Sequence, residues 1–100
     1  MTNSERALQL LGLARRAGKL VTGESFVLAA VRDKSARLVF LASDAGKSSQ
    51  KQFRDKTTSY DVPLNDSFTK DQLSTAIGSA RTVIAITDPG FVRKLQQLLK

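Results

Sequence analysis

Apolar residues recur along the chain in two periods, and their alternation divides it into helices and strands. Apolar positions spaced three and four residues apart predict amphipathic helices, whereas continuous apolar runs predict buried strands. Capping residues and glycines mark the ends of the segments. The predicted helices cover residues 4–17, 24–33, 45–56, 70–78 and 89–99, and the predicted strands cover residues 20–22, 38–42, 59–62 and 83–86.

The strands 38–42 and 83–86 are apolar throughout, which is typical of strands covered on both faces. Strands that alternate with helices predict a three-layer α/β/α sandwich with a small mixed, largely parallel four-stranded sheet. A chain of 100 residues suffices for one such domain, spanning 1–100. Binding sites in these sheets lie beyond strand ends, so we first consider the loops 43–47 and 87–90 and the turn 18–25.

Polar residues after the two buried strands are explained best as helix caps. Ser43 and Asp44 are suitable N-caps for the third helix, and Asp88 is a suitable N-cap for the last helix, where Pro89 takes the first position. Capping accounts for both aspartates without an acid pair. The third helix is mostly polar and should be the most exposed, with Phe53 as its apolar anchor.

The tetrapeptide Ala45-Gly46-Lys47-Ser48 resembles the end of a phosphate-binding P-loop. That motif requires another glycine five residues before Gly46, but Leu41 lies there, inside a strand. The backbone cradle therefore cannot form. Lys47 and Lys51 stand one helical turn apart and are either solvated surface lysines or part of a phosphate-contacting face.

Composition narrows the function further. The formal net charge is +7, and it is uneven, because residues 1–56 carry +6 and residues 57–100 carry +1. Such a basic domain attracts polyanions, of which nucleic acid is the natural candidate, although excess lysine and arginine also serve solubility alone. The surface that faces a polyanion should lie mostly in the first half.

Several residue types are absent. Without cysteine or histidine, the chain has no thiolate, no imidazole base and none of the usual zinc ligands, so we expect no catalytic residues, no metal site and no cofactor. The first residues lack the features of a signal peptide, and no apolar run reaches the roughly 20 residues that span a bilayer. The expected location is cytoplasmic, with no membrane partner and no small-molecule substrate.

The segment from Arg15 to Ser25 is the strongest candidate for binding. It joins the basic end of one helix, through Gly18 and Gly23, to the start of another, whose free backbone N–H groups and partial positive charge attract anions. Ordinary capping by the same residues explains the pattern equally well. Few aromatic residues are available for stacking single strands, which favours structured RNA as the partner.

Four motifs, taken together, are characteristic of one protein family. The first is Gly18-Lys19-Leu20-Val21-Thr22-Gly23, and the others are Ala36 to Ala45, Tyr60-Asp61-Val62-Pro63 and Lys70 to Gly78. In their order and spacing they resemble the kink-turn RNA-binding ribosomal protein family of the archaeal L7Ae type. Leu10 to Ala17 and Asp88-Pro89-Gly90-Phe91 resemble its bacterial YlxQ-type branch, and the resemblance covers nearly the whole chain. It implies an α/β/α sandwich whose second helix begins in an RNA groove.

The resemblance also implies contacts to sheared G·A pairs through a Gly-x-Asn-Glu-x-x-Lys segment. Here the glycine is Gly23, but Ser25 replaces the asparagine, Phe26 the glutamate and Ala29 the lysine. The loop Ser79-Ala80-Arg81-Thr82, which corresponds to an apolar RNA-contacting loop, carries a cation that could contact phosphate. These changes remove base-edge contacts, so kink-turn specificity is expected to weaken relative to the electrostatic part of binding.

The sequence thus predicts a non-enzymatic RNA-binding protein of the ribosomal type, with structured RNA as its partner and ribosomal RNA or the ribosome as specific cases. The predicted RNA-binding residues are Arg15, Arg16, Lys19, Thr22, Gly23, Glu24, Ser25, Lys47 and Arg81. The alternative is a protein-interaction module that kept the fold but lost specific RNA binding. The exposure of Phe26 distinguishes these two functions, because an exposed ring could anchor a protein partner. Its helical register with Ala30 favours burial instead.

Overall fold

The computed structural model describes residues 1–100, and its elements follow the predicted alternation of helix and strand. The helices are α1 (Asn3–Arg16), α2 (Glu24–Arg32), α3 (Lys47–Ser59), α4 (Lys70–Ile77) and α5 (Pro89–Leu98). The strands are β1 (Leu20–Thr22), β2 (Leu38–Leu41), β3 (Leu64–Asn65) and β4 (Val83–Ile86). None of the helices combines the length and the apolar character that crossing a membrane requires.

The four strands form one mixed sheet in the order β1-β4-β2-β3. Strand β4 runs antiparallel to both of its neighbours, with Ala85 opposite Val21 on one side and opposite Val39 on the other. Only β2 and β3 pair in parallel. The expectation of a largely parallel sheet is therefore wrong, because a continuous apolar run records burial on both faces but not strand direction.

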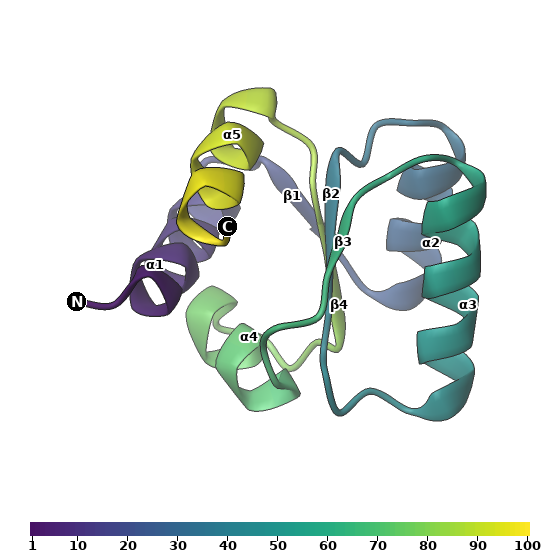
Figure 1. The fold of residues 1–100 in the computed structure, drawn as a ribbon, viewed down its shortest axis with the longest axis horizontal. Coiled ribbons are helices and arrows are strands. Elements are labelled where there is room, and N and C mark those ends of the chain that lie inside the picture. The colour runs from purple at the N-terminus through teal and green to yellow at the C-terminus, as the bar shows by residue number, and fades with distance from the viewer.

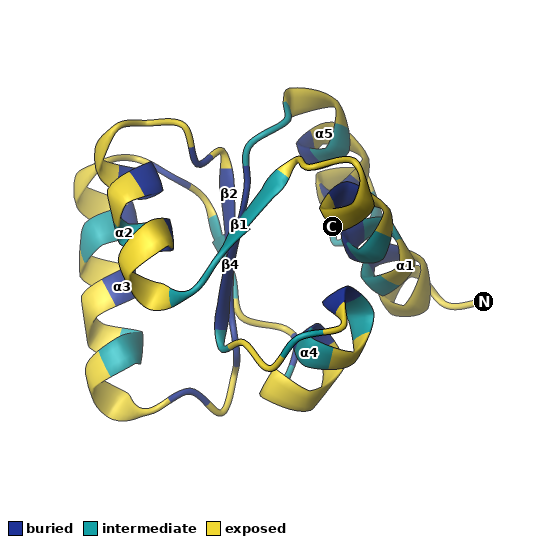
Figure 2. Ribbon diagram, turned by 180° about the vertical axis from the view of Figure 1, so that it is seen from behind, coloured by how far each residue is buried: buried dark blue, intermediate teal, exposed yellow.

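The sheet lies between two layers of helices, which confirms the α/β/α sandwich. Figure 1 shows α2 and α3 side by side on one face of the sheet and α1, α4 and α5 on the other. All residues of β2 and β4 are buried, as Figure 2 shows, and the core continues into Phe53 of α3 and Leu11 of α1. The predicted anchor role of Phe53 is confirmed, and α3 is mostly exposed.

The third strand lies further along the chain than predicted. Helix α3 runs on to Ser59, and Thr57 closes its end by accepting a backbone hydrogen bond from Val62 at 2.8 Å. Strand β3 begins only at Leu64, after Pro63, whose carbonyl accepts from the N–H of Val39. Proline is tolerated at a strand start because its missing N–H is not needed there.

The capping predictions are confirmed for α4 and α5 and wrong for α3. Thr69 caps α4 in a capping box, Gly78 ends it in the left-handed conformation, and Asp88 caps α5. Helix α3 instead begins after Gly46, without a side-chain cap. Asp44, predicted to cap α3, accepts the backbone N–H of Lys70 at 2.8 Å and so supports the start of α4.

Helices α1 and α4 approach each other closely at Gly12. A Cβ on Gly12 would stand 2.8 Å from the backbone carbonyl oxygen of Ala76, which is shorter than a van der Waals contact. Only glycine permits this approach without displacement of α1. The contact fixes the position of the first helix, which ends at Arg16; Gly18 follows its C-cap, Ala17, in the predicted left-handed conformation, with φ of +69°.

Candidate functional site

The direction of the strands brings the starts of two helices to the same end of the sheet. Strands β1 and β2 both run opposite to β4, so their carboxyl ends point the same way. Helix α2 follows β1 and helix α3 follows β2, and both therefore begin at that end (Figure 1). The loop that leads into β4 arrives there as well. We call this surface, formed by residues 22–26, 46–49 and 79–82, the glycine-capped end.

Both helices at this end begin after a glycine and lack a side-chain cap. Gly23 precedes α2 with φ of +93°, a conformation that favours glycine, and Gly46 precedes α3. Helix α2 makes its first internal hydrogen bond from Val27 to Gly23 at 2.9 Å, and α3 makes its first from Gln50 to Gly46 at 2.9 Å. The N–H groups before these bonds have no side-chain acceptor. Each terminus carries a partial positive charge of about +0.5.

A hydrogen bond joins the two helix starts. The hydroxyl of Ser49, in the first turn of α3, donates to a carboxylate oxygen of Glu24 at 2.9 Å, at the first position of α2. Lys47, at the first position of α3 and two residues before Ser49, is exposed. The carboxylate of Glu24 is the one negative charge within the glycine-capped end. It opposes an incoming anion, while Lys47 favours one.

Arg81 is held between α4 and β1, because its main chain bonds to Ser74 of α4 and its side chain bonds to Thr22 of β1. Its backbone N–H donates to the hydroxyl of Ser74, and that hydroxyl donates to its carbonyl. Its guanidinium Nε donates to the hydroxyl of Thr22 at 3.2 Å, and Nη1 donates to the carbonyl of Ala80 at 2.8 Å. These bonds leave Nη2 without a protein acceptor. The guanidinium of Arg81, whose Nη2 is still free to donate, is thus bound to Thr22, the residue before Gly23.

Arg15 reaches the same loop from α1. Its Nη1 donates to the hydroxyl of Ser79 at 2.8 Å, two residues before Arg81. The structure therefore brings together seven of the predicted binding residues at or beside the glycine-capped end. They are Arg15, Thr22, Gly23, Glu24, Ser25, Lys47 and Arg81. Gly46, Ser49 and Ser79, which connect them, were missed, because single serines and glycines carry no distinctive sequence signal.

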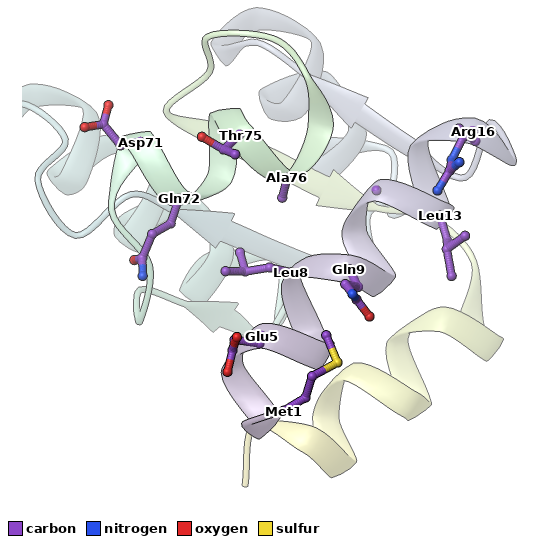
Figure 3. Close-up of a pocket in the computed structure, with 11 residues that line it drawn as sticks. Met1, Glu5, Leu8, Gln9, Leu13, Arg16, Asp71, Gln72, Thr75 and Ala76 are labelled. Carbon is purple, nitrogen blue, oxygen red and sulfur yellow. The ribbon is translucent and has the colours of Figure 1, made fainter.

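Arg16 and Lys19 lie elsewhere. Arg16 lines a groove of about 720 Å³ between α1 and α4, together with Gly12 and Thr75 (Figure 3). Lys19 stands at the opposite end of β1, where its carbonyl accepts hydrogen bonds from Thr87. Three strand residues rise about 10 Å, which separates Lys19 from the glycine-capped end. The loop 87–90 is at that opposite end too.

The three residues at positions to which the resemblance assigns base contacts all face solvent. Ser25, Phe26 and Ala29 are exposed, and the Phe26 side chain is 69% exposed. The expectation that Phe26 packs in the core with Ala30 is wrong. It lies one position beyond the buried arc of α2, which Val27, Ala30 and Val31 already fill.

The loop after β2 is closed by a side chain of α3. The amide of Gln50 donates to the carbonyl of Ala45 at 2.8 Å and more weakly to that of Ser43 at 3.4 Å. The backbone N–H groups of Ser43 and Ala45 already donate to the carbonyls of Phe68 and Ala42, so the loop offers no P-loop cradle. No group of three or more His, Cys, Asp or Glu side chains is placed to hold a metal ion.

Beyond the glycine-capped end, one ion pair crosses from α3 to the segment after β3. Nη2 of Arg54 lies 2.7 Å from the carboxylate of Asp66, and both side chains are about half exposed. The hydrogen bond from Arg54 lowers the pKa of Asp66 below its usual value. The pair occupies Arg54, so this cation is less available to an anion than Lys47 or Arg81.

Comparison with known proteins identifies the family of this chain. The sequence model of the ribosomal protein L7Ae/L30e/S12e/Gadd45 family matches residues 5–96. The chain belongs to this family. It is 40% identical over 98 residues to the RNA-binding protein YlxQ of Enterococcus faecium, covering 98% of this chain and 95% of that protein. It is 44% identical over 91 residues to the RNA-binding protein YlxQ of Bacillus subtilis (strain 168), covering 90% and 91% of the two chains.

Two solved structures support the fold of this family member. A protein of unknown function from Bacillus halodurans C superimposes with a TM-score of 0.88 at 45% identity, covering 93% of this chain and 95% of that one. The 15.5kD RNA-binding protein of Giardia lamblia superimposes with a TM-score of 0.81 at 19% identity, covering 97% and 84%. At that identity the second likeness concerns the fold alone. The names of the two YlxQ relatives describe RNA binding.

Proposed function

We propose that this protein binds structured RNA through the glycine-capped end, as a binding protein rather than an enzyme. The observation that carries the proposal is the pairing of two helix N-termini, both without side-chain caps, with the guanidinium of Arg81 held beside one of them. Backbone N–H groups and arginine are the usual phosphate contacts of nucleic-acid-binding proteins. The net charge of +7 and the RNA-binding relatives support the same partner.

We further propose that phosphate contacts supply most of the affinity and that kink-turn recognition is weaker than the family pattern implies. Ser25 can still donate one hydrogen bond, whereas Phe26 and Ala29 offer neither a carboxylate nor an ammonium group. A lost base-edge contact costs about 1–3 kcal/mol of discrimination. Ribosomal RNA, alone or in the ribosome, is a target with the required dense backbone fold.

The test is a titration of the purified protein against two labelled RNAs at several salt concentrations. One RNA contains a kink-turn, and the other is the same RNA with its G·A pairs replaced by Watson–Crick pairs. The proposal predicts binding to both RNAs, with a steep salt dependence and a modest preference for the kinked one. Absence of binding at low salt would refute it. A preference above about 100-fold would refute only the second part of the proposal.

The exposure of Phe26 favours a second candidate function, in which the ring anchors a protein partner. Exposed aromatic side chains are frequent anchors at protein interfaces. This candidate predicts that the protein binds neither RNA in the titration above. It also predicts that a partner captured from cell extract by the wild-type protein is not captured by Phe26→Ala.

A further inference from the structure

Phe26 is an isolated exposed ring. The other large apolar side chains with substantial exposure are Met1, Leu13 and Tyr60, which belong to the N-terminus, α1 and the end of α3. None of them is part of the glycine-capped end. A protein interface is usually centred on a contiguous apolar patch of several residues. The surface around Phe26 does not have that composition.

The ring instead lies among the groups proposed to contact RNA. A ring carbon of Phe26 stands 3.9 Å from the position that a Cβ on Gly23 would occupy, so the side chain leans back over the turn that begins α2. The preceding residue, Thr22, accepts the hydrogen bond from Arg81. The aromatic face and the guanidinium therefore flank two consecutive residues, Thr22 and Gly23.

Aromatic rings and nucleobases stack through their flat faces, and this contact needs no apolar patch around the ring. A base that is paired inside a duplex has both faces covered by its neighbours, so a stacking partner must be unpaired. Phosphate contacts at the two helix starts and Arg81 would hold the adjoining backbone. The ring would then meet a base that leaves the helix next to that backbone.

We infer that Phe26 stacks on an unpaired nucleobase of the bound RNA. The inference rests on the proposed function and deepens it, because it names the RNA feature that the first turn of α2 recognises. Phe26 replaces a contact to base edges by a contact to a base face. The resulting preference is for an unpaired nucleotide beside a duplex, and it tolerates different bases because every base has an aromatic face.

The experiment compares a hairpin RNA that contains one bulged nucleotide with the same hairpin fully paired. Removing a stacked ring typically weakens binding by about 5- to 150-fold. We expect Phe26→Ala to weaken binding to the bulged hairpin within this range and to leave binding to the paired hairpin unchanged. Phe26→Leu, the matched control, keeps an apolar side chain without an aromatic face and should behave like Phe26→Ala. The slope of affinity against salt should stay as in wild type.

A second measurement observes the stack directly. The chain contains no tryptophan, so Phe26→Trp introduces a single fluorophore at this position. We expect the bulged hairpin to quench its emission strongly at saturation and the paired hairpin to quench it weakly. Circular dichroism checks that each variant is folded.

Different results separate the failure of the inference from the failure of the proposed function. Wild-type binding to the bulged hairpin, together with unchanged affinity of Phe26→Ala or unquenched emission of Phe26→Trp, overturns the inference and leaves RNA binding standing. In that case the ring is free for a protein partner. If the wild-type protein binds neither hairpin at low salt, the proposed function fails and the inference fails with it.

Discussion

Replacing Arg81 by alanine tests the electrostatic part of the proposed RNA interface most directly. Four hydrogen bonds fix Arg81, two through its backbone to Ser74 and two through its guanidinium to Thr22 and Ala80. The fixed side chain loses little conformational freedom when RNA binds, so it should form a full phosphate contact. The variant loses that contact while the backbone bonds to Ser74 remain. Exposed substitutions of this kind usually change stability by less than about 0.5 kcal/mol.

The expected magnitude follows from counterion release. One phosphate contact adds about 0.7–0.9 to the slope of log affinity against log salt, depending on whether the RNA behaves as a single strand or a duplex. Arg81→Ala should lower the slope by this amount. Between 50 and 200 mM salt, wild-type affinity should therefore fall about threefold more than that of the variant. Arg81→Lys, which keeps the charge, should retain most of the slope.

Fluorescence anisotropy with a labelled structured RNA at four salt concentrations measures the slope for each variant. Lys19→Ala is the matched control, because it removes one exposed cation at the opposite end of β1. We expect its slope to equal that of wild type. The reasoning is refuted if Arg81→Ala keeps the wild-type slope, or if Lys19→Ala lowers it by the same amount.

Three further predictions concern other parts of the molecule. Glu24→Gln removes the opposing charge at the glycine-capped end, and we expect RNA affinity at low salt to rise about two- to fivefold, measured by the same anisotropy assay. Gly12→Ala forces its Cβ against the α4 backbone and should lower the free energy of unfolding in urea by about 1–3 kcal/mol, whereas Gly46→Ala, with open space around its Cβ position, should change it little. Because Arg54 lowers the pKa of Asp66 in the folded state, the pair stabilises the fold above the unfolded-state pKa and this contribution disappears as pH falls through the folded-state pKa. Asp66→Asn should therefore make unfolding stability less dependent on pH below about pH 4, and an unchanged acid profile would contradict this.

The elements whose sequence carries a local physical signal could be predicted. The capping box at Thr69, the aspartate before Pro89 and the apolar run of β2 each determine structure within a few residues, and all three predictions are confirmed. Asp44 shows the limit of such signals, because its partner Lys70 lies 26 residues away and only the tertiary fold brings them together. The direction of each strand in the sheet is likewise determined by the tertiary fold and not by local sequence. Whether Phe26 is exposed depends on which residue of α2 is the last one on its buried face. Helical spacing defines that face only to within one residue, so it could not decide between burial and exposure.

The gathering of seven predicted binding residues at one end also depends on tertiary structure, since they come from α1, β1, α2, α3 and the loop before β4. Charge alone could not select them. Arg16 and Lys19 are as basic as Arg15, yet the first faces the α1–α4 groove and the second the opposite end of β1. The excess of cations in the sequence predicts a surface that binds a polyanion. It does not predict which of the exposed lysines and arginines lie on that surface.

An interface built from backbone N–H groups explains how RNA binding could outlast changes in the base-reading segment. Gly23 and Gly46 leave the first N–H groups of α2 and α3 without side-chain acceptors, and those groups do not depend on which side chains occupy positions 25, 26 and 29. The proposed phosphate contacts therefore do not require the asparagine, glutamate and lysine whose places Ser25, Phe26 and Ala29 take. Base discrimination does depend on side chains, so it must change with them. The exposed ring of Phe26 is the group at this turn with a large surface to offer a base.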